Sequence, residues 1–210
     1  DHTGGATSVL AAQTKASVWA SLEVGHPLTK IRPVNACVAG QKWIWDGVQF
    51  EFLHPTQADY DGQASSNAIS CVLRIDANQG ATAFTKAPER GFSKASALLV
   101  GDIEAPQEFS LLQRAALQPV DVLLVPHHGS QTSSTSSFIR ALEPQWAVVQ
   151  AGYRNRYGHP AAPVLARYQA LDVELVSTPD CGAAHWQSSR PQKLQCERTQ
   201  SQRYWHYRRP

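Results

Sequence analysis

The alternation of apolar and polar positions divides the chain into strands first and then strands that alternate with helices. Residues 42–45 and 48–53 flank Asp46-Gly47, a dipeptide that favours a two-residue hairpin turn. Other apolar runs predict strands at residues 16–20, 69–75, 95–100, 120–125, 146–150, 173–176 and 183–186. Helices are predicted at residues 3–13 (after a glycine-rich turn), 106–116, 136–142 and 162–171. This order indicates an α/β fold, a sheet sandwich with helices outside it.

The second of these helices has an apolar face that the spacing of its residues defines. Phe109, Leu112 and Ala116 fall on one side of the predicted helix. Between residues 56 and 66 the chain is polar and contains Gly and Asp, which is typical of a surface loop.

Composition indicates a folded globular domain. Of the 210 residues 42% are hydrophobic and 17% charged, which excludes a disordered chain. No run of about 18 apolar residues occurs, so no membrane span is expected in this chain. There is no methionine and the chain starts inside what looks like a motif, so we expect it to be a piece of a longer protein.

The charge is unevenly distributed, although the formal net charge of +2 by itself points to no partner. We predict one domain over residues 1–190 and a basic, aromatic tail over residues 191–210. Such a tail can hold phosphates and stack bases. A solvated terminal strand or a membrane-proximal tail would have the same composition.

The four cysteines form no C-x-x-C pair, which disfavours a structural zinc site. Cys71 lies in an apolar strand and is expected to be a buried thiol. Cys181 and Cys196 flank a segment that could be a hairpin, and a disulfide between them stays open because it depends on the compartment.

Acid and imidazole side chains recur at the ends of predicted strands or the start of a helix, where open α/β folds place their chemistry. They are Asp1, His2, Asp102, His127, His128 and His159. Imidazoles and carboxylates on short, rigid loops are the ligands that Zn²⁺ or Mn²⁺ prefers. Singly, most of these residues also occur at purely structural positions, since an Asp after a strand is often a helix N-cap. The adjacent pair His127-His128 is the sharpest signal, because packing seldom needs two histidines at a strand end.

Four segments, read together and in order, carry a family resemblance. DHTGG, LLVGDIEAPQE, DVLLVPHHGSQTSS and NRYGHP resemble the metallo-β-lactamase superfamily, and within it the C-terminal domain of the ComEC family of bacterial DNA-internalisation channels. The segments CVAGQKWIWDGVQFEFLHP and NAISCVLRI are similar to the Gram-negative type. The resemblance implies a metallo-β-lactamase-like αββα sandwich, here partial, with its first strands missing.

The resemblance also implies roles for particular residues. Asp1 and His2 match the end of the superfamily's H-x-[HD]-x-D-H motif, and Asp102 matches its bridging aspartate. His159 matches the late metal histidine, and Asn67 stands in a strand where other members place a further one. The catalytic set is expected to be Asp102 with the histidine pair, in which His127 or His128 binds metal or protonates the leaving oxygen. The substrate phosphate is expected at Ser130, Ser133, Ser134 and Asn155.

The function implied is a metal-dependent phosphodiesterase that degrades the non-transported DNA strand during uptake. Two divalent ions, Zn²⁺ or Mn²⁺, are expected in the intact domain, and one or none in this chain. Expected partners are DNA, as a single strand or duplex end, the transmembrane channel domain of the same polypeptide, and other competence proteins. The expected location is the periplasmic face of the inner membrane. The alternatives are a catalytically inactive module that guides DNA, and a hydrolase of small esters or lactams on the same fold.

Overall fold

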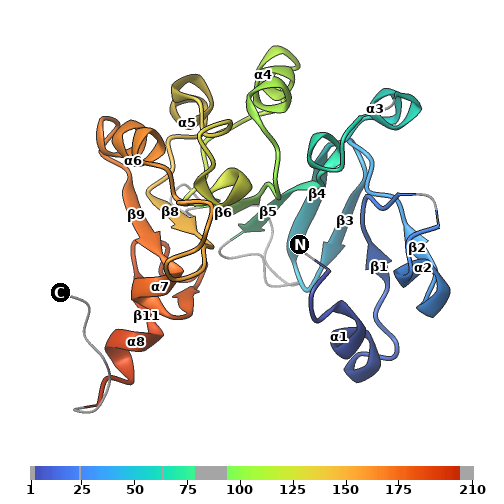
Figure 1. The fold of residues 1–210 in the computed structure, drawn as a ribbon, viewed down its shortest axis with the longest axis horizontal. Helices are drawn as coiled ribbons and strands as arrows, with labels where there is room; N and C mark the ends of the chain where they lie inside the picture. The colour runs from blue at the N-terminus through green and yellow to red at the C-terminus, as the bar shows by residue number, and fades with distance from the viewer. Residues whose placement is uncertain (1–2, 24, 63, 79–93, 204–210) are drawn as a thin grey trace, which may run out of the picture.

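A seven-stranded mixed sheet runs through the molecule (Figure 1). The computed structural model describes residues 3–23, 25–62, 64–78 and 94–203. The strands follow one another across the sheet in chain order: β3 (Lys42–Trp45), β4 (Val48–His54), β5 (Val72–Asn78), β6 (Lys94–Leu99), β7 (Val122–Leu124), β8 (Trp146–Val149) and β9 (Glu174–Ser177).

The sheet has an antiparallel half and a parallel half that meet at β6. Pairing is antiparallel from β3 to β6 and parallel from β6 to β9. The predicted hairpin is confirmed, since Asp46 and Gly47 join β3 to β4 with φ of 50° and 78°, the left-handed values that a two-residue turn requires. In the parallel half, the loops that follow the strands open at one edge of the sheet.

Three helices cover one face of the sheet: α4 (Ala105–Gln113), α5 (Ser136–Leu142) and α6 (Ala162–Gln169) (Figure 1). The core lies between them and the sheet, where Phe138 and Tyr168 pack with the strand residues Leu98, Leu123 and Val149. In the described ranges no helix is long and apolar enough to cross a membrane.

The apolar face that residue spacing predicts for α4 is not the face that the helix buries most deeply. Phe109 is 59% exposed, and the residues that α4 buries are Glu108 and Leu111. The polar Glu108 accepts hydrogen bonds from buried backbone N–H groups, so the helix turns a carboxylate rather than a phenyl ring inward.

The other face of the sheet is apolar but only partly covered. Successive residues of a strand point to opposite faces, so Leu98 is fully buried under the helices while its neighbour Leu99 is 38% exposed. Ile75 and Val122 share the face of Leu99 by strand register and are half-buried.

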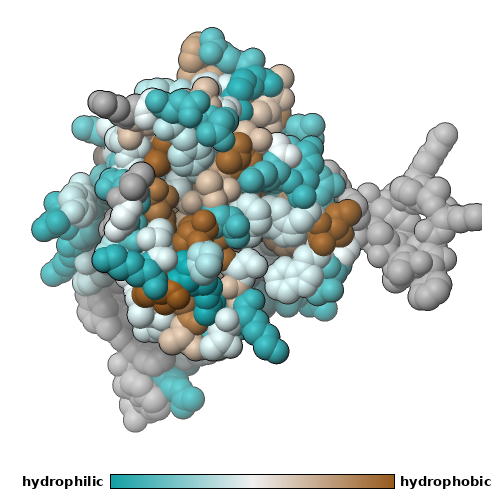
Figure 2. Space-filling view, turned by 90° about the vertical axis from the view of Figure 1, so that its right-hand side faces the viewer, coloured by the Kyte–Doolittle hydropathy of each residue, from teal (hydrophilic) through white to brown (hydrophobic). Residues whose placement is uncertain are grey.

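The amino-terminal elements flank β3: α1 (Ala6–Ala12), β1 (Val18–Trp19), α2 (Leu28–Ile31) and β2 (Val34–Asn35). Trp43 stacks on Trp19 and on Phe50, with ring centres 5.9 and 5.1 Å apart, and fixes these elements to the sheet. Figure 2 shows the face on this side, where hydrophobic residues form separate groups among hydrophilic ones.

The connection from β4 to β5 is more ordered than its polar sequence suggests. Helix α3 (Gln57–Asp61) replaces the predicted surface loop, and a 3-10 turn, η1 (Asn67–Ile69), precedes β5. The Thr56 hydroxyl and the Asp59 carboxylate form a capping box that begins α3. Cys71 is bonded to Cys37, so the expectation of a free thiol at Cys71 is wrong.

The carboxyl-terminal elements continue past the predicted end of the domain. They are α7 (Thr178–Cys181), β10 (Ala184–Trp186), β11 (Leu194–Cys196) and α8 (Glu197–Gln200). Strands β10 and β11 pair, the Cys181–Cys196 disulfide joins α7 to β11, and the Trp146 indole of β8 donates to the Pro191 carbonyl at 3.1 Å. The boundary predicted at residue 190 therefore falls inside this hairpin, and the aromatic end of the tail, residues 204–210, lies outside the described residues.

Adjacent leucines on β6 test the difference between the two faces of the sheet. We expect Leu98→Ala to cost about 2–5 kcal/mol of unfolding free energy, because it leaves a cavity in the core. Leu99→Ala should cost about 1 kcal/mol or less, because its side chain already contacts solvent. Urea denaturation of the two variants measures both values, and equal losses would contradict the assignment of an open face.

Candidate active site

Three loops meet at the carboxyl ends of β6, β7 and β8, and they carry those predicted site residues that the structure describes. Asp102 follows β6, the His127-His128 pair lies in a turn after β7, η2 (Pro126–Gly129), and His159 ends the loop after β8. Parallel strands bring these loops to one edge of the sheet, so residues far apart in the chain lie together.

Asp102 is held by the loops on both sides of it. Its backbone N–H donates to the Ser70 hydroxyl at 3.2 Å, and the carbonyl of Gly101 accepts from the His127 N–H at 3.1 Å. Gly101 has φ of 55°, and a Cβ there would lie 3.0 Å from the Ser70 Cβ. The glycine therefore permits the close approach that orients the Asp102 carboxylate.

The two adjacent histidines point to different partners. His127 and His128 both have left-handed backbone angles, with φ of 48° and 55°, which is costly for residues other than glycine. His128 Nε2 lies 3.5 Å from Asp102 Oδ1, whereas His127 Nδ1 lies 3.1 Å from Glu104 Oε1. Their ring centres are 6.4 Å apart.

The ring of His128 has a defined proton position. Its Nδ1 lies 2.7 Å from the Gln150 carbonyl, which can only accept, so Nδ1 carries the proton. In the neutral ring Nε2 then directs a lone pair towards the Asp102 carboxylate. Two such acceptors 3.5 Å apart are stabilised by a cation or a proton between them. Nitrogen and oxygen ligands of one tetrahedral zinc ion are separated by about 3.4 Å, so this spacing fits a shared metal ion.

A close contact joins the histidine turn to the loop of His159. Gly129 has φ of 82°, and a Cβ on it would lie 2.6 Å from the Pro160 Cβ. The Gly129 carbonyl also accepts from the Ala161 N–H at 2.8 Å. The two loops therefore form one rigid unit.

His159 is positioned by the side chain of Asn155. The Asn155 amide donates to the carbonyls of His159 and Gly152, at 2.6 and 3.0 Å, and its oxygen accepts from the His159 N–H at 3.0 Å. The imidazole lies 6.0 Å from that of His127 between ring centres. Burial, then the charges of His127 and His128, lower the pKa of His159, which favours the neutral form that binds metals.

Two of the predicted donors, Asp102 and His128, have a spacing that fits a divalent metal ion. Asp102 and His128 present the paired donors, and His159 Nδ1 is buried with no hydrogen-bond partner among the residues that the structure describes. Asp1 and His2, also predicted as ligands, lie outside the described residues. Within the described ranges no group of three or more His, Cys, Asp or Glu side chains has metal-binding spacing.

The chain is similar in sequence to parts of several known bacterial proteins. Competence protein ComA of Neisseria gonorrhoeae is 36% identical over 146 residues, which make up 69% of this chain and 18% of that protein. The chain resembles a segment of bacterial competence proteins. Recombination protein 2 of Haemophilus influenzae is 32% identical over 185 residues, 85% of this chain and 20% of that protein. Uncharacterized protein YcaI of Escherichia coli is 33% identical over 183 residues, 87% of this chain and 21% of that protein.

The chain spans about one fifth of the length of these curated relatives. No family model matches it. Among solved structures, a mutant of CmlA beta-hydroxylase gives a TM-score of 0.49 with 11% identity, covering 80% of this chain and 39% of that one.

The serines of the histidine turn support the loop from inside. Ser133 and Ser134 are fully buried, and the Ser133 hydroxyl donates to the carbonyls of Pro126 and Ser130. The expectation that these two hydroxyls hold a phosphate does not fit their burial. Ser130 is 6% exposed and its hydroxyl bonds with that of Thr132 at 3.0 Å. Asn155 is likewise committed to positioning His159.

Two site residues were missed in reading the sequence. Glu104 contacts His127 and accepts from the Thr132 hydroxyl at 2.9 Å, and only its place two residues after Asp102 could have indicated it. Glu108 is fully buried and accepts from the backbone N–H groups of Ser134 and Thr135 at 2.5 and 2.8 Å. Burial raises the pKa of Glu108, against the opposing effect of these hydrogen bonds. The position of Glu108 in the predicted helix did not indicate that it would accept these backbone hydrogen bonds.

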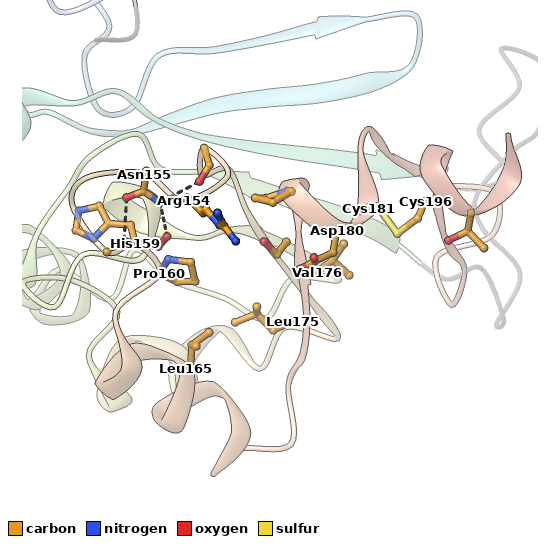
Figure 3. A pocket seen from close by; sticks show the side chains of 15 residues that line it. Arg154, Asn155, His159, Pro160, Leu165, Leu175, Val176, Asp180, Cys181 and Cys196 are labelled. Atoms are coloured by element: carbon orange, nitrogen blue, oxygen red, sulfur yellow. Dashed lines mark hydrogen bonds between the residues drawn. A yellow bond between two sulfur atoms is a disulfide. The ribbon is translucent and has the colours of Figure 1, made fainter. Parts of the chain in front are cut away.

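A pocket of about 710 Å³ opens beside His159 (Figure 3). The loop that carries Arg154, Asn155 and His159 lines one end, and the Cys181–Cys196 disulfide lies at the other. Leu165 of α6 and Leu175 of β9 supply apolar lining. Its volume lies within the range of ligand pockets, and it borders the loop of His159.

Two glycine substitutions test the contact between the loops. Gly129→Ala should destabilise the chain by more than about 2 kcal/mol, because the left-handed angle costs about 1–2 kcal/mol and the new methyl group displaces Pro160. Gly158→Ala is the matched control, since Gly158 has φ of 67° but nothing within 4 Å of a Cβ. Gly158→Ala should therefore lose only the free energy that the left-handed backbone angle costs, about 1–2 kcal/mol. Thermal unfolding of both variants measures the difference, and equal losses would contradict a role for the contact with Pro160.

Proposed function

We propose that this chain is a metal-dependent phosphodiesterase domain on a metallo-β-lactamase-like fold, acting on DNA in a competence protein of the ComEC type. The observation that carries the proposal is the approach of His128 to Asp102, beside His159, at the edge where three parallel strands end. The similarity to competence proteins supports DNA as the substrate. The strand hydrolysed would be the one that is not transported.

Asp102, His128 and His159 would hold the metal ion, together with Asp1 and His2. A divalent ion at such a site, Zn²⁺ or Mn²⁺, supplies a hydroxide nucleophile near neutral pH and stabilises charge that develops at phosphorus. The Asp102 backbone hydrogen bond and the Gln150 carbonyl fix the orientation of the two ligands before substrate binds.

His127 is the residue that would protonate the leaving oxygen. His128 is committed through both ring nitrogens, whereas His127 contacts Glu104, whose carboxylate orients the ring. The His127 imidazole is 22% exposed, so a substrate at the edge of the sheet can reach it. The different partners of the two histidines support His127 as the proton donor and His128 as the metal ligand.

The location that fits this function is the periplasmic face of the inner membrane. Two disulfides, Cys37–Cys71 and Cys181–Cys196, use all four cysteines of the chain, and such bonds persist in oxidising compartments. The membrane channel portion of the same polypeptide and other competence proteins would be the partners.

A module that guides DNA without cleaving it is the second candidate. The observation that favours it is Asn67, which begins η1 next to the Asp102 loop, at a position where a further metal histidine was expected from the resemblance. The two candidates differ in what the Asp102 carboxylate contributes: cleavage in one, little in the other.

Cleavage of labelled single-stranded and duplex DNA with Mn²⁺ or Zn²⁺ tests the proposal. We expect Asp102→Asn to lower the rate by roughly 10²-fold or more, because the variant weakens the hold on the metal ion and its charge. Glu174→Gln is the matched control, since Glu174 stands at the amino end of β9, away from the loops, and should leave the rate unchanged. A version extended at its amino end should be assayed in parallel. DNA binding without any metal-dependent cleavage in either form would favour the guiding module.

The compartment can be tested through the cysteines. We expect protein purified without reductant to show no free thiol by mass spectrometry after alkylation. Each bridge should contribute roughly 3 kcal/mol by constraining the unfolded chain, so reduction should lower the unfolding midpoint. Free thiols in the folded protein would contradict an oxidised, periplasmic form.

A further inference from the structure

The loop between β8 and His159, residues 152–158, presents two arginines and two tyrosines that the proposed cleavage does not use. Tyr153 and Tyr157 are 50% and 65% exposed, and Arg154 and Arg156 are exposed beside them. The Arg154 guanidinium lies 5.2 Å from the centre of the Tyr153 ring, and that of Arg156 lies 4.8 Å from the centre of the Tyr157 ring.

This Arg-Tyr loop has a fixed backbone although its side chains face solvent. The Asn155 side chain bonds the main chain at Gly152 and His159, and the Gly158 N–H donates to the Asn155 carbonyl at 3.2 Å. Arg154 and Gly158 take left-handed angles, with φ of 50° and 67°. A surface ordered in this way loses little entropy when a ligand binds.

The charge of the loop's own segment favours an anionic ligand, although Asp180 lines the adjoining pocket. Residues 144–171 contain Arg154, Arg156 and Arg167 and no Asp or Glu. Arg167 donates to the carbonyls of Ser133 and Ser134 and is occupied there, so Arg154 and Arg156 are the exposed positive charges of this segment. Exposed guanidinium groups next to exposed aromatic rings are the pattern that binds single-stranded nucleic acid.

The Arg-Tyr loop is continuous with the candidate active site. The Tyr157 ring stacks on the His159 imidazole, with centres 5.8 Å apart and planes 20° apart. Arg154 and Asn155 also line the pocket beside His159 (Figure 3). A strand that crosses the loop therefore reaches His159 and has space beyond it.

We propose that the Arg-Tyr loop binds unpaired nucleotides of a DNA strand, with bases stacked on Tyr153 and Tyr157 and phosphates bound by Arg154 and Arg156. Arg156 also donates to the Tyr157 hydroxyl at 2.6 Å. Because both guanidinium groups are exposed, each would exchange its contact with the tyrosine for a phosphate when a base stacks on the ring. The proposal rests on the proposed function and specifies its substrate: the strand presented at His159 is single-stranded, since paired bases offer no free face for stacking.

Equilibrium binding of fluorescent oligothymidylate in the presence of EDTA tests this loop without cleavage. We expect Tyr153→Ala/Tyr157→Ala to weaken binding at least tenfold, which is the scale of one lost base stack. Arg154→Ala/Arg156→Ala should reduce the slope of log Kd against log salt by about 1.4, the value for two contacts to a single strand. Binding of a blunt duplex should change much less for the tyrosine variant.

Matched controls are available on the helices. Phe109→Ala removes an aromatic ring that is 59% exposed on α4, and Arg140→Ala removes an exposed guanidinium on α5. Both should bind the oligonucleotide as the unchanged chain does. All these side chains are exposed, so the variants should fold, which circular dichroism confirms.

Three results would overturn the proposal. In the first, Tyr153→Ala/Tyr157→Ala binds the oligonucleotide as tightly as the Phe109→Ala control does. In the second, it loses single-stranded and duplex binding equally, which would mean that the loop contacts only the sugar-phosphate backbone of DNA. The chain could instead bind vesicles of anionic lipid through these residues and no oligonucleotide, which would make the loop a membrane contact. A failure of the proposed function is seen separately, as an absence of metal-dependent cleavage while oligonucleotide binding and its loss in the tyrosine variant persist.

Discussion

The contact between Gly129 and Pro160 is the constraint on which the candidate site depends. It joins the turn after β7 to the loop after β8, and the Ala161 N–H bond to the Gly129 carbonyl adds to it. Without this contact the sheet alone would bring the loops to one edge but would not fix their side chains. The similar approach of Gly101 to Ser70 fixes the loop after β6. Glycine is required at both positions because any Cβ would hold the neighbouring segment away.

The left-handed conformation of His127 and His128 explains how adjacent side chains reach two different partners. Consecutive left-handed residues reverse the chain tightly, so the two side chains diverge, one towards Asp102 and the other towards Glu104. The conformation is costly, and the surrounding contacts maintain it: the His127 N–H bonds the Gly101 carbonyl, and the His128 ring bonds the Gln150 carbonyl. Strain that persists under such support is common at functional sites.

Much of this architecture could be predicted from the sequence, because it is determined by interactions between residues close together in the chain. The hairpin at Asp46-Gly47, the alternation of strands and helices, and the helix at residues 136–142 follow from turn chemistry and periodicity. The features that the sequence did not predict depend on partners far away in the chain. Glu108 is buried because a turn 26 residues away needs acceptors, and Cys71 pairs with a cysteine 34 residues earlier. Ser133 and Ser134 were expected to bind phosphate, and their burial also depends on partners elsewhere in the chain. A polar sequence does not show whether its side chains bond to water or to buried groups of the protein.

The two disulfides lie on either side of the candidate site at the edge of the sheet. Cys71 is adjacent to Ser70, whose hydroxyl accepts from the Asp102 N–H, so the bond to Cys37 restrains the support of that carboxylate. Cys181 and Cys196 line the far end of the pocket that begins at His159. In a small domain whose second sheet face is partly open, the buried apolar area is limited, and covalent links offset that by restricting the unfolded chain. An oxidising compartment would therefore preserve the geometry of the site as well as the stability of the fold.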